Sequence, residues 1–268
     1  MVEIIEGLRF ASALAELKCR IQKDEKIEPY SDILDDKFLM GFLRGKKWDV
    51  DKAMICLQHY IKMRTVKYKN FTKLYRPSTV KFLDKGVLNL LKHRDPHGRL
   101  VLLAQINKWS PSEIPADEAI ATALFIVDEG IRSFLSTGNE CVAIFDCAGI
   151  TFAQARNATP KKIILLIDMF TKNIPTKPKG VHFINHGFIV HHLYRFASPM
   201  LEKKIRERVH FHSNTSQLHG HIPAKILPTS LDGELETEDA FDTSQDAVVR
   251  GNDYFYERLA SELQIVKK

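Results

Sequence analysis

The stretch GVHFINHGFIVHHLYRFASPMLEKKIRERVHFH, from Gly180 to His212, decides how this chain folds. It begins with a short apolar strand pattern, continues with an apolar helix pattern from Phe188 to Phe196, and ends with another strand pattern. A strand, a helix and a further strand in this order predict a crossover unit, in which the two strands run parallel in one sheet.

The same alternation begins further upstream, after the polar turn HRDPHGR at residues 93–99. Short apolar runs predict strands, and longer stretches with an apolar stripe on one face predict helices. We expect strands over residues 100–106, 141–145, 180–185 and 209–212, and helices over residues 119–135, 160–172, 188–196 and 202–208. The sequence therefore predicts an α/β fold with a mostly parallel sheet.

The residues before this turn predict helices. Acidic residues at 35–36 and at Asp49 open two helix patterns, because negative charge is favourable at a helix N-terminus. The first ninety or so residues contain no strand pattern. We expect three regions, namely an N-terminal helical bundle over residues 1–93, an α/β domain over 94–245 and a helical C-terminal tail over 246–268.

The composition is typical of a globular protein with a sizeable core, since 44% of the 268 residues are hydrophobic and 27% are charged. No apolar run reaches the roughly 18–20 residues that cross a bilayer, and the N-terminus has no secretory signal pattern. The four cysteines form no C-x-x-C pair, which favours reduced thiols. We therefore expect a cytoplasmic protein, and we expect it to be a monomer.

Positive charge is concentrated in one segment. The net charge of the chain is +6, and residues 177–208 hold seven Lys or Arg and two Glu, which is a net +5. The rest of the chain is therefore close to +1. A local basic segment predicts a local anionic partner, such as a membrane surface, rather than nucleic acid.

The common catalytic fingerprints are absent, including the G-x-S-x-G elbow, the phosphate-binding loop, G-x-G-x-x-G and H-E-x-x-H. The sequence therefore predicts no enzyme, no catalytic residue and no cofactor. Asp146 follows a strand pattern, at a position where active-site residues gather in parallel sheets. Its other interpretation, which we favour, is a carboxylate that caps a turn through backbone N–H groups.

Histidines are unusually dense near the end of the predicted sheet. Eight of them fall within forty residues: His182, His186, His191, His192, His210, His212, His219 and His221. A metal ion needs three or four converging ligands, and no cysteine or close carboxylate joins these histidines in sequence. We favour surface or hydrogen-bonded histidines and predict no metal site.

The apolar helix at residues 188–196 has two interpretations. Its apolar side chains can be ordinary core, or they can form a lid or membrane element, because apolar residues beside Lys and Arg suit a lipid interface. The side chains in question are Phe188, Ile189, Leu193 and Phe196.

Five segments carry a more specific pattern: DKFLMGFLRGKKWDVDKA at 36–53, RDPHGR at 94–99, AIFDCAG at 143–149, GVHFIN at 180–185 and KIRERVH at 204–210. In this order they resemble the CRAL-TRIO family of lipid carriers, with the greatest similarity to the tocopherol and retinaldehyde transfer proteins. The resemblance covers about residues 30–245. It implies a helical N-terminal domain and an α/β domain with an apolar pocket under a gate helix, at residues 188–196.

The resemblance also implies which residues touch the ligand and the membrane. An apolar ligand needs a dry, apolar wall. The implied pocket-lining positions are Ile120, Ala123, Leu124, Val127, Cys141, Phe145, Leu166, Met169, Phe170, Ile174, Val181 and Phe183. The positions that contact a phosphoinositide headgroup in the tocopherol carriers fall on Lys177, Lys179, Lys204 and Arg208, and all four are basic in this chain.

Three departures from the family pattern stand out. Ala123 and Val127 replace small hydroxyl residues of the tocopherol carriers, which leaves the identity of the ligand open. Residues 185–187 read Asn-His-Gly where the family usually has Asn-Glu-Pro, so we expect a looser hinge before the gate helix. Residues 227–233 also differ from the usual pattern at two positions.

These observations predict a carrier that binds one isoprenoid-like lipid, such as a tocopherol, a retinoid or a carotenoid. It would move this lipid between membranes and dock on phosphoinositide-containing surfaces as a peripheral protein. Two alternatives remain open: a lipid-gated adaptor, and an enzyme that acts on a lipid through Asp146 or the histidines.

Overall fold

The N-terminal part of the protein is a group of helices. The computed structural model describes residues 2–67, 77–132, 140–171, 174–175 and 178–264. Side chains of Asp35 and Asp49 cap two of the N-terminal helices by accepting hydrogen bonds from the backbone N–H groups of Phe38 (2.9 Å) and Lys52 (3.0 Å), as the acidic openings predicted. The elements are α1 (Val2–Lys23), η1 (Glu28–Ile33), α2 (Asp36–Gly45), α3 (Val50–Lys62) and η2 (Met63–Lys67).

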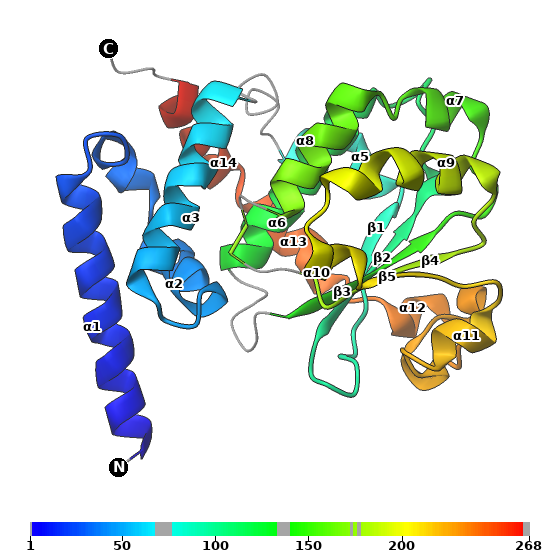
Figure 1. The fold of residues 1–268 in the computed structure, drawn as a ribbon, viewed down its shortest axis with the longest axis horizontal. Helices are drawn as coiled ribbons and strands as arrows, with labels where there is room; N and C mark the ends of the chain where they lie inside the picture. Colours follow the sequence, from blue (N-terminus) through cyan, green and yellow to red (C-terminus); the bar gives the residue numbers. More distant parts are fainter. Residues whose placement is uncertain (1, 68–76, 133–139, 172–173, 176–177, 265–268) are drawn as a thin grey trace.

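A five-stranded sheet forms the centre of the second part (Figure 1). Its strands lie side by side in chain order, and those from β2 to β5 are parallel, which confirms the predicted crossover units. They are β1 (Leu88–Leu90), β2 (Leu100–Gln105), β3 (Cys141–Asp146), β4 (Gly180–Ile184) and β5 (Val209–Phe211).

The strand β1 corrects the expectation that the first ninety residues contain no strand. It has only three residues, Leu88–Leu90, which is too short to show an alternating pattern. It forms because β2 offers a hydrogen-bonding edge, and the two strands pair antiparallel. The division into regions at residues 93 and 245 stays a prediction.

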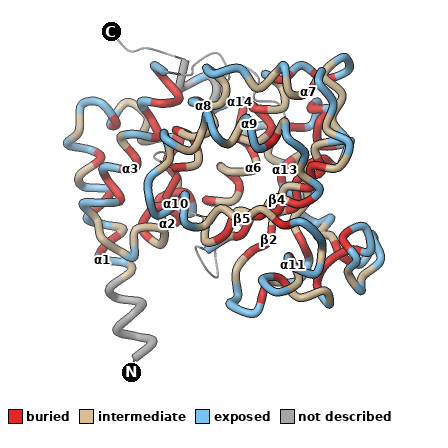
Figure 2. Tube along the Cα trace, turned by 45° about the vertical axis from the view of Figure 1, so that its right-hand side comes forward, coloured by how far each residue is buried: buried red, intermediate tan, exposed pale blue. Residues whose placement is uncertain are grey.

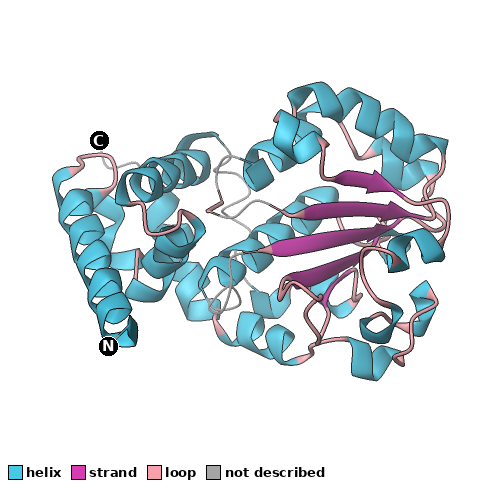
Figure 3. Cartoon of the chain, turned by 60° about the horizontal axis from the view of Figure 1, so that its bottom comes forward, coloured by secondary structure: helices cyan, strands magenta, loops and turns pink. Residues whose placement is uncertain are grey.

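Each face of the sheet is covered by different helices. The crossovers of this chain-ordered parallel sheet use α6 (Ala116–Arg132), α8 (Pro160–Thr171) and α9 (Phe188–Ala197), and right-handed crossovers place all three on one face. The other face packs against α11 (Thr215–His219), η7 (Ala224–Ile226) and η8 (Thr229–Leu231). Figure 3 shows the sheet lying between these layers.

Two core clusters correspond to this arrangement. The larger joins the N-terminal helices to α6 and α8 and includes Phe42, Leu57 and Phe125. The smaller joins one face of the sheet to the segment from α11 to η8 and includes Ile144 and Leu227. The sheet is therefore anchored on one side by its own small core.

The C-terminal helix over residues 253–264 returns to the N-terminal helices, where it contacts η1 and η2, and it also reaches α6. The Tyr256 hydroxyl group donates to the Glu129 carboxylate of α6 at 3.1 Å. A buried ion pair between Arg64 and Asp128, with Nη2 and Oδ1 2.5 Å apart, joins the N-terminal helices to α6.

The remaining elements are η3 (Pro77–Thr79), α5 (Lys81–Asp84), η4 (Ile106–Lys108), α7 (Phe152–Arg156), η6 (Ser198–Met200), α10 (Lys203–Arg206), α12 (Thr237–Ala240), α13 (Ser244–Gly251) and α14 (Asp253–Gln264). Within the described ranges, no helix combines the length and the apolar character needed to span a bilayer.

Candidate functional site

The two faces of the sheet are packed to very different degrees. On the face toward α11 and η8, Val142, Ile144 and Ile184 are at most 1% exposed. On the face toward α6, α8 and α9, the intervening apolar residues of β3, β4 and β5 are only half-buried. Strands alternate their side chains between faces, so one sealed face and one partly open face belong to the same strands.

The strand register arranges the partly open face in rows. We name as the apolar wall its half-buried residues: Leu102, Cys141, Ala143, Phe145, Val181, Phe183, Val209 and Phe211. Three of its rings form a ladder, with ring centres 5.1 Å apart between Phe145 and Phe183 and 5.0 Å apart between Phe183 and Phe211. Among the described residues, the wall members on β3, β4 and β5 belong to neither core cluster.

The twelve predicted pocket-lining residues divide into two groups. Four are buried, and three of these, Leu124, Met169 and Ile174, belong to the larger core cluster; the fourth is Ile120. The other eight are half-buried and come from α6, β3, α8 and β4: Ala123, Val127, Cys141, Phe145, Leu166, Phe170, Val181 and Phe183. Four of these eight belong to the apolar wall: Cys141, Phe145, Val181 and Phe183.

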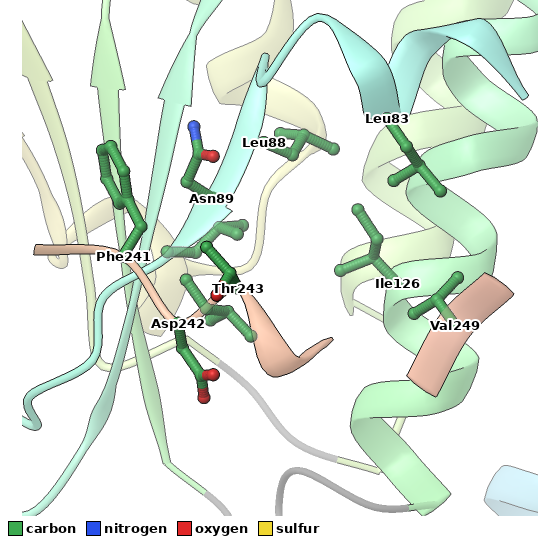
Figure 4. A pocket seen from close by; sticks show the side chains of 10 residues that line it. Leu83, Leu88, Asn89, Ile126, Phe241, Asp242, Thr243 and Val249 are labelled. Atoms are coloured by element: carbon green, nitrogen blue, oxygen red, sulfur yellow. The ribbon is translucent and has the colours of Figure 1, made fainter. Parts of the chain in front are cut away.

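None of the twelve residues lines either of two pockets in the described part of the chain. One, of about 50 Å³, continues the apolar wall sideways from Leu102 to Leu88 and Leu90 of β1, with Ile126 of α6 and Val249 opposite (Figure 4). The other, of about 480 Å³, lies between residues 107–112 and 151–157 at the carboxyl end of the sheet.

The predicted gate helix is the least buried cover of this face. Only Val190 of α9 is buried, while Phe188 is 79% exposed and Phe196 is 42% exposed (Figure 2). Ile189 and Leu193 are half-buried. The helix α6, by contrast, is a core helix, because it has buried residues along its whole length. The exposed phenylalanines of α9 therefore set it apart from the core helices of this fold.

The loop before α9 is tied to the neighbouring loop after β3. The Asp146 carboxylate accepts from the Ala148 backbone N–H at 3.1 Å and from the Asn185 side-chain amide at 2.9 Å. This confirms the turn-capping interpretation of Asp146. Asn185 has a positive φ of 53°, and Gly187 precedes the helix without a side-chain cap. The backbone thus changes direction sharply where α9 begins.

Four histidines cluster on the sealed side of the sheet, near its β5 edge. The rings of His182, His210, His212 and His221 lie about 5 Å apart in most pairs, and His182 Nδ1 and His212 Nε2 share a hydrogen bond of 2.8 Å. Burial, followed by the neighbouring imidazoles, lowers the pKa of His182 to about 3 and that of His212 to about 4.

His182 and His212 are therefore neutral at pH 7, and the four rings pack as structural neighbours. In the part of the chain that the structure describes, no group of three or more His, Cys, Asp or Glu side chains is arranged to hold a metal ion.

The comparison with family models agrees with this geometry. The model of the CRAL/TRIO domain matches residues 84–233. This chain belongs to the CRAL/TRIO family. The match spans the sheet from just before β1, both layers that cover it, and α9.

Relatives of this CRAL/TRIO chain include two kinds of curated protein. The alpha-tocopherol transfer protein-like protein of Mus musculus is 34% identical over 215 residues, which cover 78% of this chain and 62% of that protein. Clavesin-1 of Rattus norvegicus is 30% identical over 209 residues, which cover 76% of this chain and 59% of that protein. The chain spans about three fifths of the length of these relatives.

The fold is also shared with a solved structure. The crystal structure of Sfh5 aligns with a TM-score of 0.60 and covers 95% of this chain and 97% of that chain. The sequences are 11% identical, so this likeness concerns the fold alone.

Three of the four predicted basic residues of this CRAL/TRIO chain lie near the amino ends of β4 and β5. Arg208 Nη1 donates to the Pro178 carbonyl at 2.7 Å, and Lys179 pairs with the Glu140 carboxylate at the surface. Lys204 is exposed on α10. Lys177 lies outside the described residues.

Sequence reasoning did not single out Phe211, which ends the aromatic ladder. The alternation of the strand contained the signal, because side chains at 210 and 212 share one face and the side chain between them must point to the other. Tyr194 of α9 was also missed, although its ring centre lies 5.0 Å from that of Phe211.

Proposed function

We propose that this CRAL/TRIO protein binds one hydrophobic small molecule against the apolar wall, beneath α9, and transfers it between membranes. The observation that carries the proposal is the unequal packing of the two sheet faces. Apolar side chains that stay half-buried forgo stabilisation of roughly 25 cal/mol for each Å² left in water. A ligand that covers the apolar wall would recover this stabilisation, and so would a closing lid.

The same proposal gives α9 a role as a gate. Its exposed Phe188 and Phe196, with Met200 of η6, present apolar surface that suits insertion between lipid headgroups. The printed name of the mouse relative, alpha-tocopherol transfer protein-like, also supports a lipid-carrying role for this chain.

Docking on anionic lipid would use the basic residues beside the end of α9. Arg208 uses one N–H group on the Pro178 carbonyl, and a guanidinium has five donors, so the others can meet a phosphate group. Lys179 is held by a surface ion pair with Glu140, and such pairs are weak enough to exchange for a headgroup. With Lys204 and Lys177, these residues form the proposed phosphoinositide site.

Native mass spectrometry of the purified protein, followed by transfer of the bound lipid to vesicles, tests this function. We expect one unmodified lipophile per chain and its delivery to phosphoinositide-containing vesicles. A chain that carries no lipophile and takes none from donor vesicles would contradict the proposal. Chemical turnover of the bound lipid would show instead that the protein is an enzyme.

A further inference from the structure

His186, at the base of the proposed gate, borders both the apolar wall and α9. Its ring centre lies 4.5 Å from that of His191 on α9 and 5.1 Å from that of Phe211 on the wall. Both contacts are edge-to-face, with interplanar angles of 88° and 86°. His191 also stacks on Phe211 at 4.7 Å. His186 is therefore part of an aromatic cluster at the end of the ladder.

Both ring nitrogens of His186 are buried, and neither has a hydrogen-bond partner among the described residues. Of the described side chains with such unpaired buried atoms, only His186 has two. Buried polar atoms are normally satisfied, because an unpaired one has lost its hydrogen bonds to water without replacement. A phenylalanine would fill the same space without this cost, so packing alone does not account for a histidine here.

The protonation state of His186 defines what it can bind. Burial, and then His191, lower the pKa of His186. The backbone of His212 lies close enough to the ring to oppose part of this shift, but its geometry leaves both ring nitrogens without a hydrogen bond. The ring is therefore neutral at pH 7, with one N–H donor and one acceptor nitrogen. Among the described residues, the side chain whose charge lowers this pKa is His191, and no carboxylate contributes to the shift.

We propose that His186 is the polar anchor of the ligand site, and that it binds the terminal hydroxyl or carbonyl group of an otherwise apolar ligand lying along the apolar wall. This inference rests on the proposed carrier function and narrows its ligand class. A hydroxyl group can use the donor or the acceptor of the ring, and a carbonyl group can use the donor. A pure hydrocarbon leaves both ring nitrogens unpaired, so it should bind more weakly than a ligand of the same shape with a hydroxyl or carbonyl group.

Two fluorescent probes of the same shape test the anchor, namely retinol and its deoxy analogue, which has the same polyene and no hydroxyl group. Titrations would compare the wild type with His186→Phe, which keeps an aromatic ring and removes both nitrogens. We expect the preference for retinol over the hydrocarbon to fall by about tenfold in His186→Phe, the effect of one lost buried hydrogen bond. His186→Gln should restore part of the preference, because an amide donates and accepts.

A matched control and a stability measurement separate binding from folding. His97→Phe makes the same replacement at an exposed position in the turn before β2, outside the apolar wall and α9, and should leave the preference unchanged. The ligand-free His186→Phe protein should melt no lower than the wild type, because the phenylalanine leaves no buried, unpaired ring nitrogens at this position. If His186 had only a structural role, His186→Phe would instead lower the melting temperature and leave the preference for retinol unchanged.

The results distinguish the anchor from the carrier function. If wild type and His186→Phe prefer retinol over its deoxy analogue to the same degree, His186 is not the anchor, and the proposed carrier function is unaffected. A co-purified lipophile without a hydroxyl or carbonyl group would also overturn it. If neither probe binds and no lipophile co-purifies, the carrier function and the anchor fall together.

Discussion

Ala123 of α6 is half-buried at a position that the resemblance assigns to the ligand site. An indole introduced there would occupy space that a ligand needs. We expect Ala123→Trp to weaken binding of a fluorescent lipophile at least tenfold, while circular dichroism and the melting temperature stay close to wild type. Ile164→Trp places the same indole on an exposed position of α8 and is the control. Wild-type affinity in Ala123→Trp would show that Ala123 does not line the site.

Neighbouring residues of α6 show how far sequence reasoning reaches at single positions. Helix periodicity placed Leu124 on the apolar face, and the resemblance assigned both Ala123 and Leu124 to the pocket, yet Leu124 is 1% exposed in the larger core cluster and Ala123 is half-buried beside it. The difference arises because α6 packs against the sheet on one side and against N-terminal helices on the other. Periodicity identifies an apolar stripe, but it contains no information on which neighbour each side chain meets.

Phe188, the first residue of α9, carries a prediction about the gate. It is 79% exposed, so Phe188→Ala should leave the free energy of unfolding almost unchanged. If Phe188 enters the membrane, its loss removes roughly 1.5–3 kcal/mol of apolar burial, which weakens vesicle affinity roughly ten- to a hundredfold. Stopped-flow transfer of a fluorescent lipid would slow accordingly. Tyr254→Ala, at an equally exposed aromatic residue of α14, is the matched control, and equal slowing in both variants would rule out a specific role for α9.

The basic residues at the start of β5 and on α10 carry a second prediction. Each Lys or Arg near an anionic membrane contributes about 1 kcal/mol, so changing Lys204 and Arg208 together to Ala should weaken binding to phosphoinositide vesicles roughly tenfold or more. The weakening should shrink at high salt, because salt screens these charges. Co-sedimentation measures it, with Lys92→Ala and Lys225→Ala as a control pair of equal charge. An unchanged affinity of the first pair would exclude this docking surface.

Elements were predicted from sequence with uneven success, for physical reasons. The four parallel strands and their crossover helices followed from apolar runs and stripes, since these elements bury a whole face. The strand β1 escaped because three residues, Leu88–Leu90, depend on the edge of β2 for their structure. The exposure of α9 could not be inferred from its apolar residues, which fit a core helix equally well.

The molecule as a whole should lose stability in acid because of the histidine cluster. The folded-state pKa values of about 3 for His182 and about 4 for His212 lie below the usual 6.5. The unfolded chain therefore binds protons that the folded protein excludes. The contribution of these two histidines to the free energy of unfolding is fully present above pH 6.5. It falls as the pH drops from 6.5 toward 4, by at most about 1.4 kcal/mol per histidine and pH unit.

Urea denaturation at pH 7.5 and pH 5.0 measures this loss. In His182→Asn the amide can still hydrogen-bond to His212 but does not titrate, so we expect a smaller difference between the two pH values than in wild type. His192→Asn, at an exposed position on α9, should keep the wild-type difference. A wild-type stability that is flat across this range would contradict the prediction.

The division of the sheet into a sealed face and an open face also affects how such a protein can evolve. Val142, Ile144 and Ile184 hold the sheet to its own core, so substitutions there reduce stability and are removed by selection. Substitutions at Phe145 or Phe183 change the half-buried apolar wall, which is the surface proposed to meet a ligand, and leave that core untouched. Under the proposed carrier function, duplicated copies of one ancestral gene can therefore diverge in cargo through a handful of changes on one face, each compatible with a folded protein from the first step.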